Sequence, residues 1–256
     1  MTCSARQPDA PEPVLAFHLL GQVPYDEALA LQQHLVHDAA VNHSASVSVL
    51  FCEHPELITV GRRGSRGHVR MSGEQLKREG LALRWVSRGG GCILHSPGQL
   101  AIYPIVPLAV FGWSVRQYLQ RLQQAILTAF SQLQVHGQTQ PGRFAVWGQS
   151  GLLAAVGVAV RDEVTCHGTF LNVNPPMRRF AFVDAIAPDD VGVGLKTTMG
   201  CLLAERRTAV RMATVRAAFV ECLAAAFGSD RYHLHTGHPL LVRALGTCRE
   251  STLCER

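Results

Sequence analysis

Three adjacent glycines stand out among the residues that could carry chemistry. They lie within the segment Arg88–Gln99, which reads RGGGCILHSPGQ. Glycines let the backbone approach a ligand closely and present its N–H groups to it. His95 follows four residues after the last glycine, so the segment is predicted to form one wall of a pocket. A glycine-rich hairpin without a ligand fits equally well, because three glycines in a row are not a phosphate-loop pattern.

Two cysteines close to histidines are candidate nucleophiles. Cys92 follows the glycine run near His95, and Cys166 precedes His167. Neighbouring residues on a strand point to opposite faces, so Cys166 and His167 are not expected to act as a pair. His167 is instead a candidate to face the pocket that holds His95. For both cysteines the alternative is a buried role as a small hydrophobic residue.

Composition narrows the classes of function. The chain has 24 basic and 19 acidic residues and a net charge of +5, which does not favour nucleic acid binding. Only Lys77 and Lys196 are lysines, so chemistry that requires an amine has two candidates. The eight cysteines form no CxxC pair, and neither a metal site nor a cofactor is expected. No apolar run reaches the roughly 18–20 residues of a membrane span and no signal segment is visible, so a cytoplasmic location is predicted.

Hydrophobic periodicity predicts the elements that must position these residues. The predicted helices span 24–40, 72–79, 114–133 and 208–227, and the predicted strands span 14–20, 47–52, 57–60, 83–86, 100–106, 144–147, 152–160 and 168–173. This order predicts one α/β (α+β) domain with a mixed sheet flanked by helices. The domain is expected to cover 14–227, after a disordered leader at 1–13 and before a C-terminal tail at 228–256.

Taken in chain order, the motifs resemble the octanoyltransferases of lipoate biosynthesis, which belong to the biotin/lipoate protein ligase fold superfamily. The resemblance runs over about residues 14–200. The matching segments are Glu53-His54-Pro55, Thr59 with Gly61-Arg62-Arg63-Gly64, Arg88-Gly89-Gly90, His95 with Pro97-Gly98-Gln99-Leu100, Tyr103-Pro104, Gly157-Val158, His167-Gly168 and Leu171–Asn174. The resemblance implies a biotin/lipoate protein ligase-like catalytic domain.

The resemblance also implies a reaction and its partners. In the family, a cysteine thiolate takes octanoate from acyl carrier protein as a thioester, and the acyl group then passes to a lysine of a lipoyl domain. A pocket lysine lowers the pKa of that cysteine. The substrate-binding residues implied by the resemblance are Arg88, Gly89, Gly90, Gly91, His95, Gly98, His167, Gly168 and Asn172.

This sequence departs from the family at both reactive positions. Leu152 stands at the position of the lysine, and Asp189 stands at the position of the cysteine. A leucine carries no charge, and acylation of a carboxylate would give a hydrolysable anhydride. We expect Leu152 and Asp189 to line one cavity with Arg88, the glycine run, His95 and His167. In that cavity the pKa of Asp189 should be raised, unless Lys196 or Arg88 reaches it.

Three functions follow from these departures. The chain is either an acyltransferase with a rearranged site, in which Lys196, Cys92 or Cys166 takes over, or a pseudoenzyme. The pseudoenzyme would keep the fold and bind an acyl group, a lipoyl domain or a partner subunit without transferring anything. A thioesterase is a third alternative. The loss of both reactive groups favours the binding protein on chemical grounds.

Overall fold

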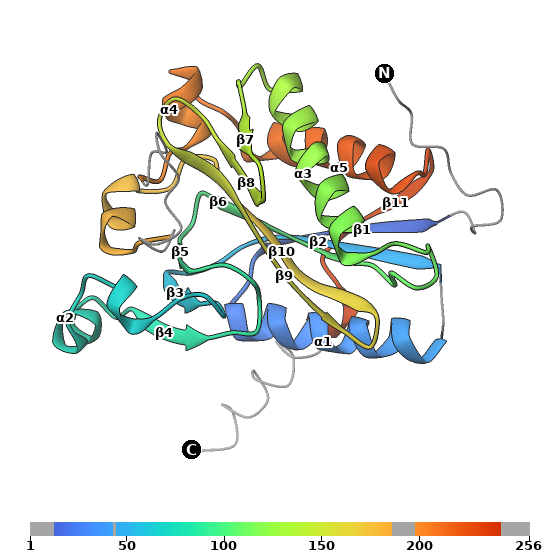
Figure 1. The fold of residues 1–256 in the computed structure, drawn as a ribbon, viewed down its shortest axis with the longest axis horizontal. Helices are drawn as coiled ribbons and strands as arrows, with labels where there is room; N and C mark the ends of the chain where they lie inside the picture. The colour runs from blue at the N-terminus through green and yellow to red at the C-terminus, as the bar shows by residue number, and fades with distance from the viewer. Residues whose placement is uncertain (1–12, 43–44, 186–197, 242–256) are drawn as a thin grey trace, which may run out of the picture.

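A mixed eight-stranded sheet forms the centre of the protein (Figure 1). The computed structural model describes residues 13–42, 45–185 and 198–241. The strand order is β11-β1-β2-β6-β10-β9-β8-β7, in which β1 pairs in parallel with both β2 and β11 and the other pairs are antiparallel. The strands are β1 (Val14–Gln22), β2 (Ser46–Glu53), β6 (Gln99–Ile105), β7 (Gln138–Gln140), β8 (Arg143–Trp147), β9 (Leu152–Arg161), β10 (Val164–Asn172) and β11 (Tyr232–Thr236).

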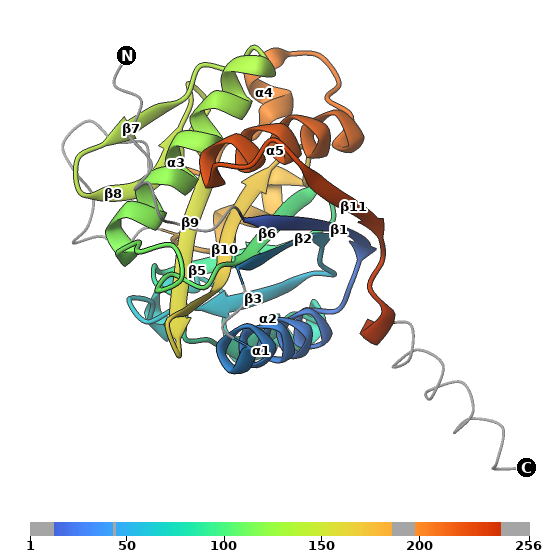
Figure 2. The same ribbon diagram turned by 90° about the vertical axis from the view of Figure 1, so that its right-hand side faces the viewer.

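Helices cover both faces of this sheet (Figure 2). On one face, α3 (Val115–Gln132) and α5 (Met212–Phe227) pack against each other, and α3 also contacts β8 and β9. On the other face, α1 (Tyr25–Asn42) packs on β10 and β6. The central strands are therefore apolar in both directions, as strands covered on two sides must be. In β2, for example, Val49 and Phe51 belong to the core beneath α3 and α5, while Leu50 belongs to the core beneath α1.

The start of α3 is defined by its sequence. The hydroxyl of Ser114 accepts a hydrogen bond from the backbone N–H of Gln117, and the Gln117 side chain accepts one from the N–H of Ser114. This reciprocal capping box satisfies two backbone donors at the helix start. Tyr118, Leu122 and Ile126 then recur at helical spacing and are buried against the sheet.

A second, three-stranded sheet carries the glycine run. Its order is β4-β3-β5, and its strands are β4 (Ala82–Trp85), β3 (Leu57–Val60) and β5 (Cys92–His95). The glycines lie in the connection between β4 and β5. The remaining elements are α2 (Gly73–Arg78), α4 (Leu202–Arg206) and two 3-10 helices at Arg66–His68 and Met177–Phe182.

The fold confirms the predicted mixed sheet with flanking helices, and six of its elements differ from those predicted from the sequence. β10 begins at Val164 and not at 168, and α5 begins at Met212 and not at 208. β5, β7 and α4 had not been predicted. β11 lies in the segment assigned to the tail, so the sheet extends past the predicted domain end at 227. The predicted leader lies outside the described residues except for Pro13.

Within 13–42, 45–185 and 198–241, no helix combines the length and apolar character needed to cross a membrane.

Candidate functional site

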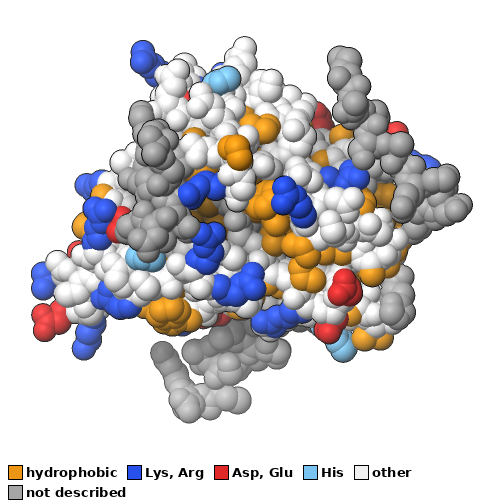
Figure 3. Space-filling model, viewed as in Figure 1, with side chains coloured by type: hydrophobic (Ala, Val, Ile, Leu, Met, Phe, Trp, Pro, Cys, Tyr) orange, Lys and Arg blue, Asp and Glu red, His pale blue; other side chains and the backbone are white. Residues whose placement is uncertain are grey.

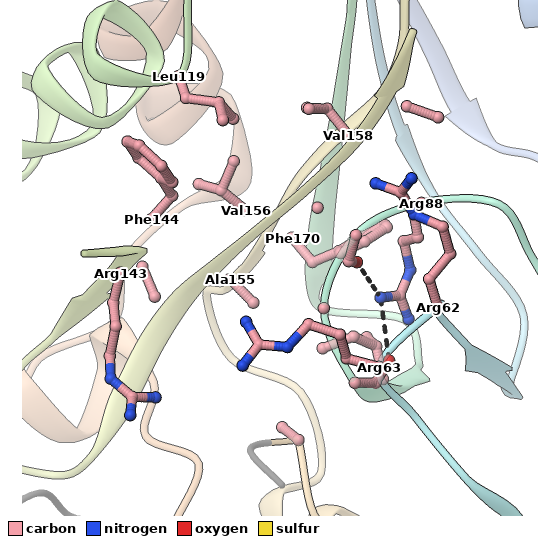
Figure 4. A pocket seen from close by; sticks show the side chains of 18 of the residues that line it. Arg62, Arg63, Arg88, Leu119, Arg143, Phe144, Ala155, Val156, Val158 and Phe170 are labelled. Atoms are coloured by element: carbon pink, nitrogen blue, oxygen red, sulfur yellow. Dashed lines mark hydrogen bonds between the residues drawn. The ribbon is translucent and has the colours of Figure 1, made fainter. Parts of the chain in front are cut away.

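A cavity of about 490 Å³ lies between the glycine run and one edge of β9 (Figure 4). This volume is within the range of small-molecule sites. Its apolar wall includes Ile93, Leu119, Phe144, Trp147, Leu152, Ala155, Val156, Val158 and Phe170. Its polar side chains are mainly arginines: Arg62, Arg63, Arg88 and Arg143. The site is therefore suited to an elongated apolar group with a polar or anionic end.

The cavity exists because β9 is only partly covered by its neighbour. β8 pairs with β9 as far as the Ala145–Ala155 pair, and further along β9 the N–H of Gly89 donates to the carbonyl of Val158 at 2.9 Å. The strand edge between these two contacts is left open toward the start of α3. Gly157 is required here, because a Cβ at this position would lie 2.6 Å from the carbonyl oxygen of Gly89.

Arg88 supports the glycine run from behind. Its side chain is 1% exposed. Nη1 donates to the carbonyl oxygens of Gly89 and Gly91 at 3.0 Å each, and Nη2 donates to the carbonyl and the hydroxyl of Thr59. The guanidinium also lies over the ring of Phe170, 5.6 Å from its centroid. Burial lowers the pKa of Arg88, but a guanidinium remains a cation in proteins.

Three other arginines border the cavity. Arg62 and Arg63 follow β3, and Arg143 begins β8 on the opposite side of β9 (Figure 4). Figure 3 shows basic side chains beside hydrophobic surface on this face of the molecule. A cluster of like charge around an apolar opening concentrates anionic groups at its mouth.

Leu152 lies in the cavity wall and is 2% exposed. Its N–H donates to the carbonyl of Thr198, and its carbonyl accepts from the N–H of Gly200, both at 2.9 Å. The segment 198–200 is thus fixed beside Leu152. Asp189 and Lys196 lie outside the described residues, so the expectation that Asp189 faces Leu152 stays a prediction.

The expectation that His95 and His167 share this cavity is wrong, because neither lines it. His95 is fully buried behind the ring of Phe170, with ring centroids 4.6 Å apart. Its Nε2 is 2.8 Å from the hydroxyl of Thr59 and its Nδ1 is 3.0 Å from Oε1 of Gln99. Burial lowers the pKa of His95 well below its usual value, so the ring is neutral.

His167 lines a separate cavity of about 140 Å³ with Gln32 and Cys166. Its φ of 58° is left-handed, and its N–H donates to Oε1 of Gln32 at 2.7 Å. The left-handed backbone breaks the alternation of a strand, so Cys166 and His167 line the same cavity and not opposite faces. Burial lowers the pKa of His167 to about 4 and raises that of Cys166. Together these shifts disfavour a thiolate–imidazolium pair.

Cys92 also does not line the cavity beside β9. It is fully buried, and its thiol is 3.5 Å from the carbonyl oxygen of Ser65. Burial raises its pKa, which disfavours the nucleophilic thiolate. Neither thiol considered as a replacement nucleophile therefore faces the cavity.

Three further predicted site residues contact neighbouring segments and do not line the cavity. Gly98 has a φ of +87°, and its N–H donates to the carboxylate of Glu53 at 2.9 Å. A Cβ at Gly168 would collide with the carbonyl oxygen of Ile102 on β6. Asn172 is buried, and its Nδ2 donates to the carbonyl of Gly200 at 2.9 Å. Their roles in substrate binding stay predictions.

Several residues of the site were not singled out as site residues from the sequence. Thr59 and Gln99, which bind Arg88 and His95 beside the cavity, belong to motifs that resemble the family, and this membership is the signal that could have identified them. Arg143 and Phe144 carry no such signal, since they reach the cavity only because β8 is placed beside β9. Among the described residues, no three His, Cys, Asp or Glu side chains come close enough together to hold a metal ion.

Residues 24–224 match the family described as the lipoyl protein ligase A/B catalytic domain. An octanoyltransferase of Syntrophotalea carbinolica is 39% identical over 154 residues, which cover 60% of this chain and 69% of that protein. An octanoyltransferase of Porphyromonas gingivalis is 32% identical over 183 residues, and the match covers 68% of this chain but only 37% of that longer protein.

The fold is shared with a solved structure at low sequence identity. A bipartite lipoate protein ligase of Thermoplasma acidophilum, described with its E2 lipoyl domain, has a TM-score of 0.60 and 14% identity. The match covers 87% of this chain and 88% of that one. At this identity the likeness concerns the fold alone.

Proposed function

Because the chain belongs to the lipoyl protein ligase A/B catalytic domain family, we propose that it acts in octanoyl transfer for protein lipoylation. We further propose that its part is to bind the octanoyl group and its carrier, without holding the group covalently. The first part of the proposal, a role in octanoyl transfer, is supported by its relatives, which are named octanoyltransferases. The second part, binding without a covalent intermediate, is supported by the chemistry of the cavity wall.

That wall fits an acyl chain. It is built from aliphatic and aromatic side chains along the open edge of β9. Each methylene group removed from water there stabilises the complex by ~0.8 kcal/mol. Arg62, Arg63 and Arg143 at the border are suited to the polar end of the ligand and to anionic groups of the protein that delivers it.

The same wall lacks the groups that covalent acyl transfer requires. Among the described residues that line the cavity, none carries a thiol, hydroxyl, imidazole, amine or carboxylate. Leu152 occupies the position at which the family has its lysine. Asp189 stands at the cysteine position, and a carboxylate would give an anhydride that water destroys. Covalent catalysis needs an activated nucleophile, and these two residues supply neither the nucleophile nor its activator.

The alternative is a working transferase with a rearranged site. Cys92 and Cys166 are poor replacements because both thiols are buried outside the cavity and burial raises their pKa values. Lys196 is the remaining candidate, and it follows Asp189 by seven residues. A thioesterase that uses the Asp189 carboxylate is a third candidate, and no described residue that lines the cavity carries an imidazole or a carboxylate to assist it.

Intact-mass analysis decides between these functions. The purified chain is incubated with octanoyl-acyl carrier protein and an apo-lipoyl domain. We expect no octanoyl adduct on this chain and no modified lipoyl domain. An adduct on the unmodified chain would overturn the binding role, and its mapped position would identify the true nucleophile. Release of free octanoate without an adduct would favour the thioesterase.

A double variant, Leu152→Lys with Asp189→Cys, provides the positive control. It restores an activating amine and a thiol at the family positions. We expect this variant to form the thioester and to octanoylate the lipoyl domain. Each single variant should stay inactive, because the thiol and its activating cation are both required.

The partners and the compartment follow from the same proposal. The Thermoplasma protein is described with an E2 lipoyl domain, and an equivalent domain is the acceptor that we propose for this chain. Acyl carrier protein is the proposed donor, and the cytoplasm is the proposed location. Binding of either carrier should weaken as salt is raised, because the arginines border an exposed opening.

A further inference from the structure

A continuous chain of buried side-chain hydrogen bonds starts at Arg88 and ends at the backbone of Gly200. Nη2 of Arg88 is 2.8 Å from Oγ1 of Thr59, which is 2.8 Å from Nε2 of His95. Nδ1 of His95 is 3.0 Å from Oε1 of Gln99, whose Nε2 is 2.9 Å from Oδ1 of Asn172. Nδ2 of Asn172 is 2.9 Å from the carbonyl oxygen of Gly200.

The direction of this chain is fixed by groups that cannot exchange donor and acceptor roles. The guanidinium of Arg88 only donates. The carbonyl oxygens of Leu94 and Gly200 only accept. Nε2 of Gln99 also donates to the Leu94 carbonyl at 3.1 Å, so the Gln99 amide cannot be reversed. The Gly200 carbonyl fixes the Asn172 amide in the same way.

One tautomer of His95 satisfies these constraints. Oε1 of Gln99 is an acceptor, so Nδ1 of His95 must carry the proton. Nε2 is then unprotonated and accepts from the hydroxyl of Thr59. Every donor therefore points the same way, from the Arg88 cation to the Gly200 carbonyl. Such aligned hydrogen bonds polarise and strengthen one another in a low-dielectric interior.

Each end of the hydrogen-bond chain is bonded to residues that line the acyl cavity. At its start, Arg88 also binds the carbonyl oxygens of Gly89 and Gly91 in the glycine run. At its end, Gly200 donates to the carbonyl of Leu152. In between, the His95–Gln99 hydrogen bond crosses from β5 of the small sheet to β6 of the large sheet.

We propose that Thr59, His95 and Gln99 are positioning residues that hold the glycine wall and the Leu152 wall of the cavity in register through this one-directional chain. The proposal rests on the proposed function only in calling the cavity an acyl site. It states that a change at one end of the hydrogen-bond chain alters the structure at the other end. Thr59 itself forms no hydrogen bond with Leu152 or Gly200 in the network described above.

The first measurement concerns the tautomer. In the free protein at neutral pH, two-bond ¹H–¹⁵N spectra of labelled histidine should show His95 neutral and protonated at Nδ1. A His95 ring protonated at Nε2, or at both nitrogens, would overturn the direction of the chain.

The second measurement breaks the chain at one end and records hydrogen exchange at the other. Thr59→Val keeps the shape of the side chain and removes the hydroxyl. We expect exchange of the Leu152 and Gly200 amides to accelerate by about tenfold, which corresponds to the loss of one buried hydrogen bond to a charged group. Thr59→Ser retains the hydroxyl and should restore slow exchange at both amides. Acceleration confined to the neighbourhood of Thr59 would overturn the proposal.

A matched control separates coupling from a general loss of stability. Gln99→Met removes the three hydrogen bonds that the buried Gln99 amide makes with His95, Leu94 and Asn172. Gln32→Met removes another buried glutamine, whose amide accepts from the N–H of His167. We expect Gln99→Met to accelerate exchange of the Gly89 and Gly200 amides and Gln32→Met to leave both unchanged. Equal effects of the two variants would overturn the proposal. If Thr59→Val does not fold, Gln99→Met and its control still test whether the two walls are coupled.

These measurements use the free protein and need neither octanoate nor a carrier. If amide exchange at the two walls is coupled but the protein forms a covalent octanoyl adduct, only the proposed function is refuted. If amide exchange at the two walls is not coupled and the protein forms no such adduct, only this inference is refuted.

Discussion

The hydrogen bonds of Arg88 end on oxygen atoms of the backbone and of Thr59 and not on a carboxylate. Its planar fork spans two carbonyl groups of the glycine run with one nitrogen and Thr59 with the other. A lysine ammonium is a compact donor that cannot span both sets of acceptors. Arg88 thus determines the shape of the glycine wall from inside the protein.

Arg88→Lys should therefore lower the free energy of unfolding by about 2–4 kcal/mol, because buried carbonyl groups lose their donors. Urea denaturation measures the change. Arg143→Lys, at the border of the same cavity, keeps a cation at a partly exposed position and should change stability by less than about 0.5 kcal/mol. Equal effects at the two positions would contradict the role assigned to Arg88.

Gly157 can be tested by adding one methyl group. A Cβ at Gly157 would lie 2.6 Å from the Gly89 carbonyl oxygen, which is backbone and cannot rotate away. Gly157→Ala should lower the free energy of unfolding by about 1–3 kcal/mol. It should also weaken octanoate binding, measured by calorimetry, because the glycine wall must move. Gly73→Ala, at the start of α2, has no atom within 4 Å of the new Cβ and serves as the control, with unchanged or slightly raised stability expected.

Sequence reasoning at this scale located motifs better than it located side chains. The glycine run and Leu152 lie in the cavity wall. His95 was expected to face the same cavity, but its position depends on Thr59, which lies 36 residues earlier in the chain. His167 was misassigned because its left-handed backbone depends on the side chain of Gln32, far away in sequence. Local patterns carry no information about such partners.

At the scale of elements, the helices were the most predictable. The helices α1 and α3 begin and end within two residues of the predicted bounds. The apolar stripe of α3 is clear, whereas the buried face of α1 is less distinct and includes the polar Gln32. The strand β10 was half missed, since Thr165, Cys166 and His167 are polar or small residues that are nonetheless buried. The strand β11 was missed because all five of its residues are exposed and its partner is β1, at the other end of the chain.

The short helix α4 has a defined task that can be tested. The carboxylate of Glu205 accepts hydrogen bonds from the backbone N–H groups of Gln149 at 3.0 Å and Ser150 at 2.6 Å. These residues form the turn that leads into β9 and Leu152. Glu205→Ala should lower the free energy of unfolding by about 1–2 kcal/mol and accelerate exchange of the two turn amides.

Glu221→Ala, on the exposed side of α5, provides the comparison for that change. It removes the same kind of side chain from a helix and should leave the turn amides unaffected. If both variants changed exchange in the turn equally, Glu205 would have no special role there.

For the whole molecule, buried histidines set the pH dependence of stability. Burial is the main cause that lowers the pKa values of His18, His54 and His167 to about 4, below the unfolded value of 6.5. Between pH ~6.5 and 4 these histidines are therefore protonated in the unfolded chain but neutral in the folded protein. Stability should be complete above pH ~6.5 and should fall as the pH drops toward 4, by up to about 3 kcal/mol for each such group.

Urea denaturation at a series of pH values tests this expectation. The free energy of unfolding should be clearly smaller at pH 5 than at pH 7.5. His18→Asn should reduce the slope, while His136→Asn, at an exposed position, should leave it unchanged. A profile that is flat or that rises as the pH falls would show that these imidazoles are not held neutral by the fold.

The pairing of β1 with β11 has a consequence for the biosynthesis of this protein. Leu15 pairs with Tyr232, so the strand of this sheet that is translated first is completed by the strand that is translated last. β2 closes one side of β1 early, because the two are separated only by α1. The other side remains an open edge until β11 has been translated. An open edge is a template for pairing with other chains, so the nascent protein is most vulnerable to misassembly on this side of β1.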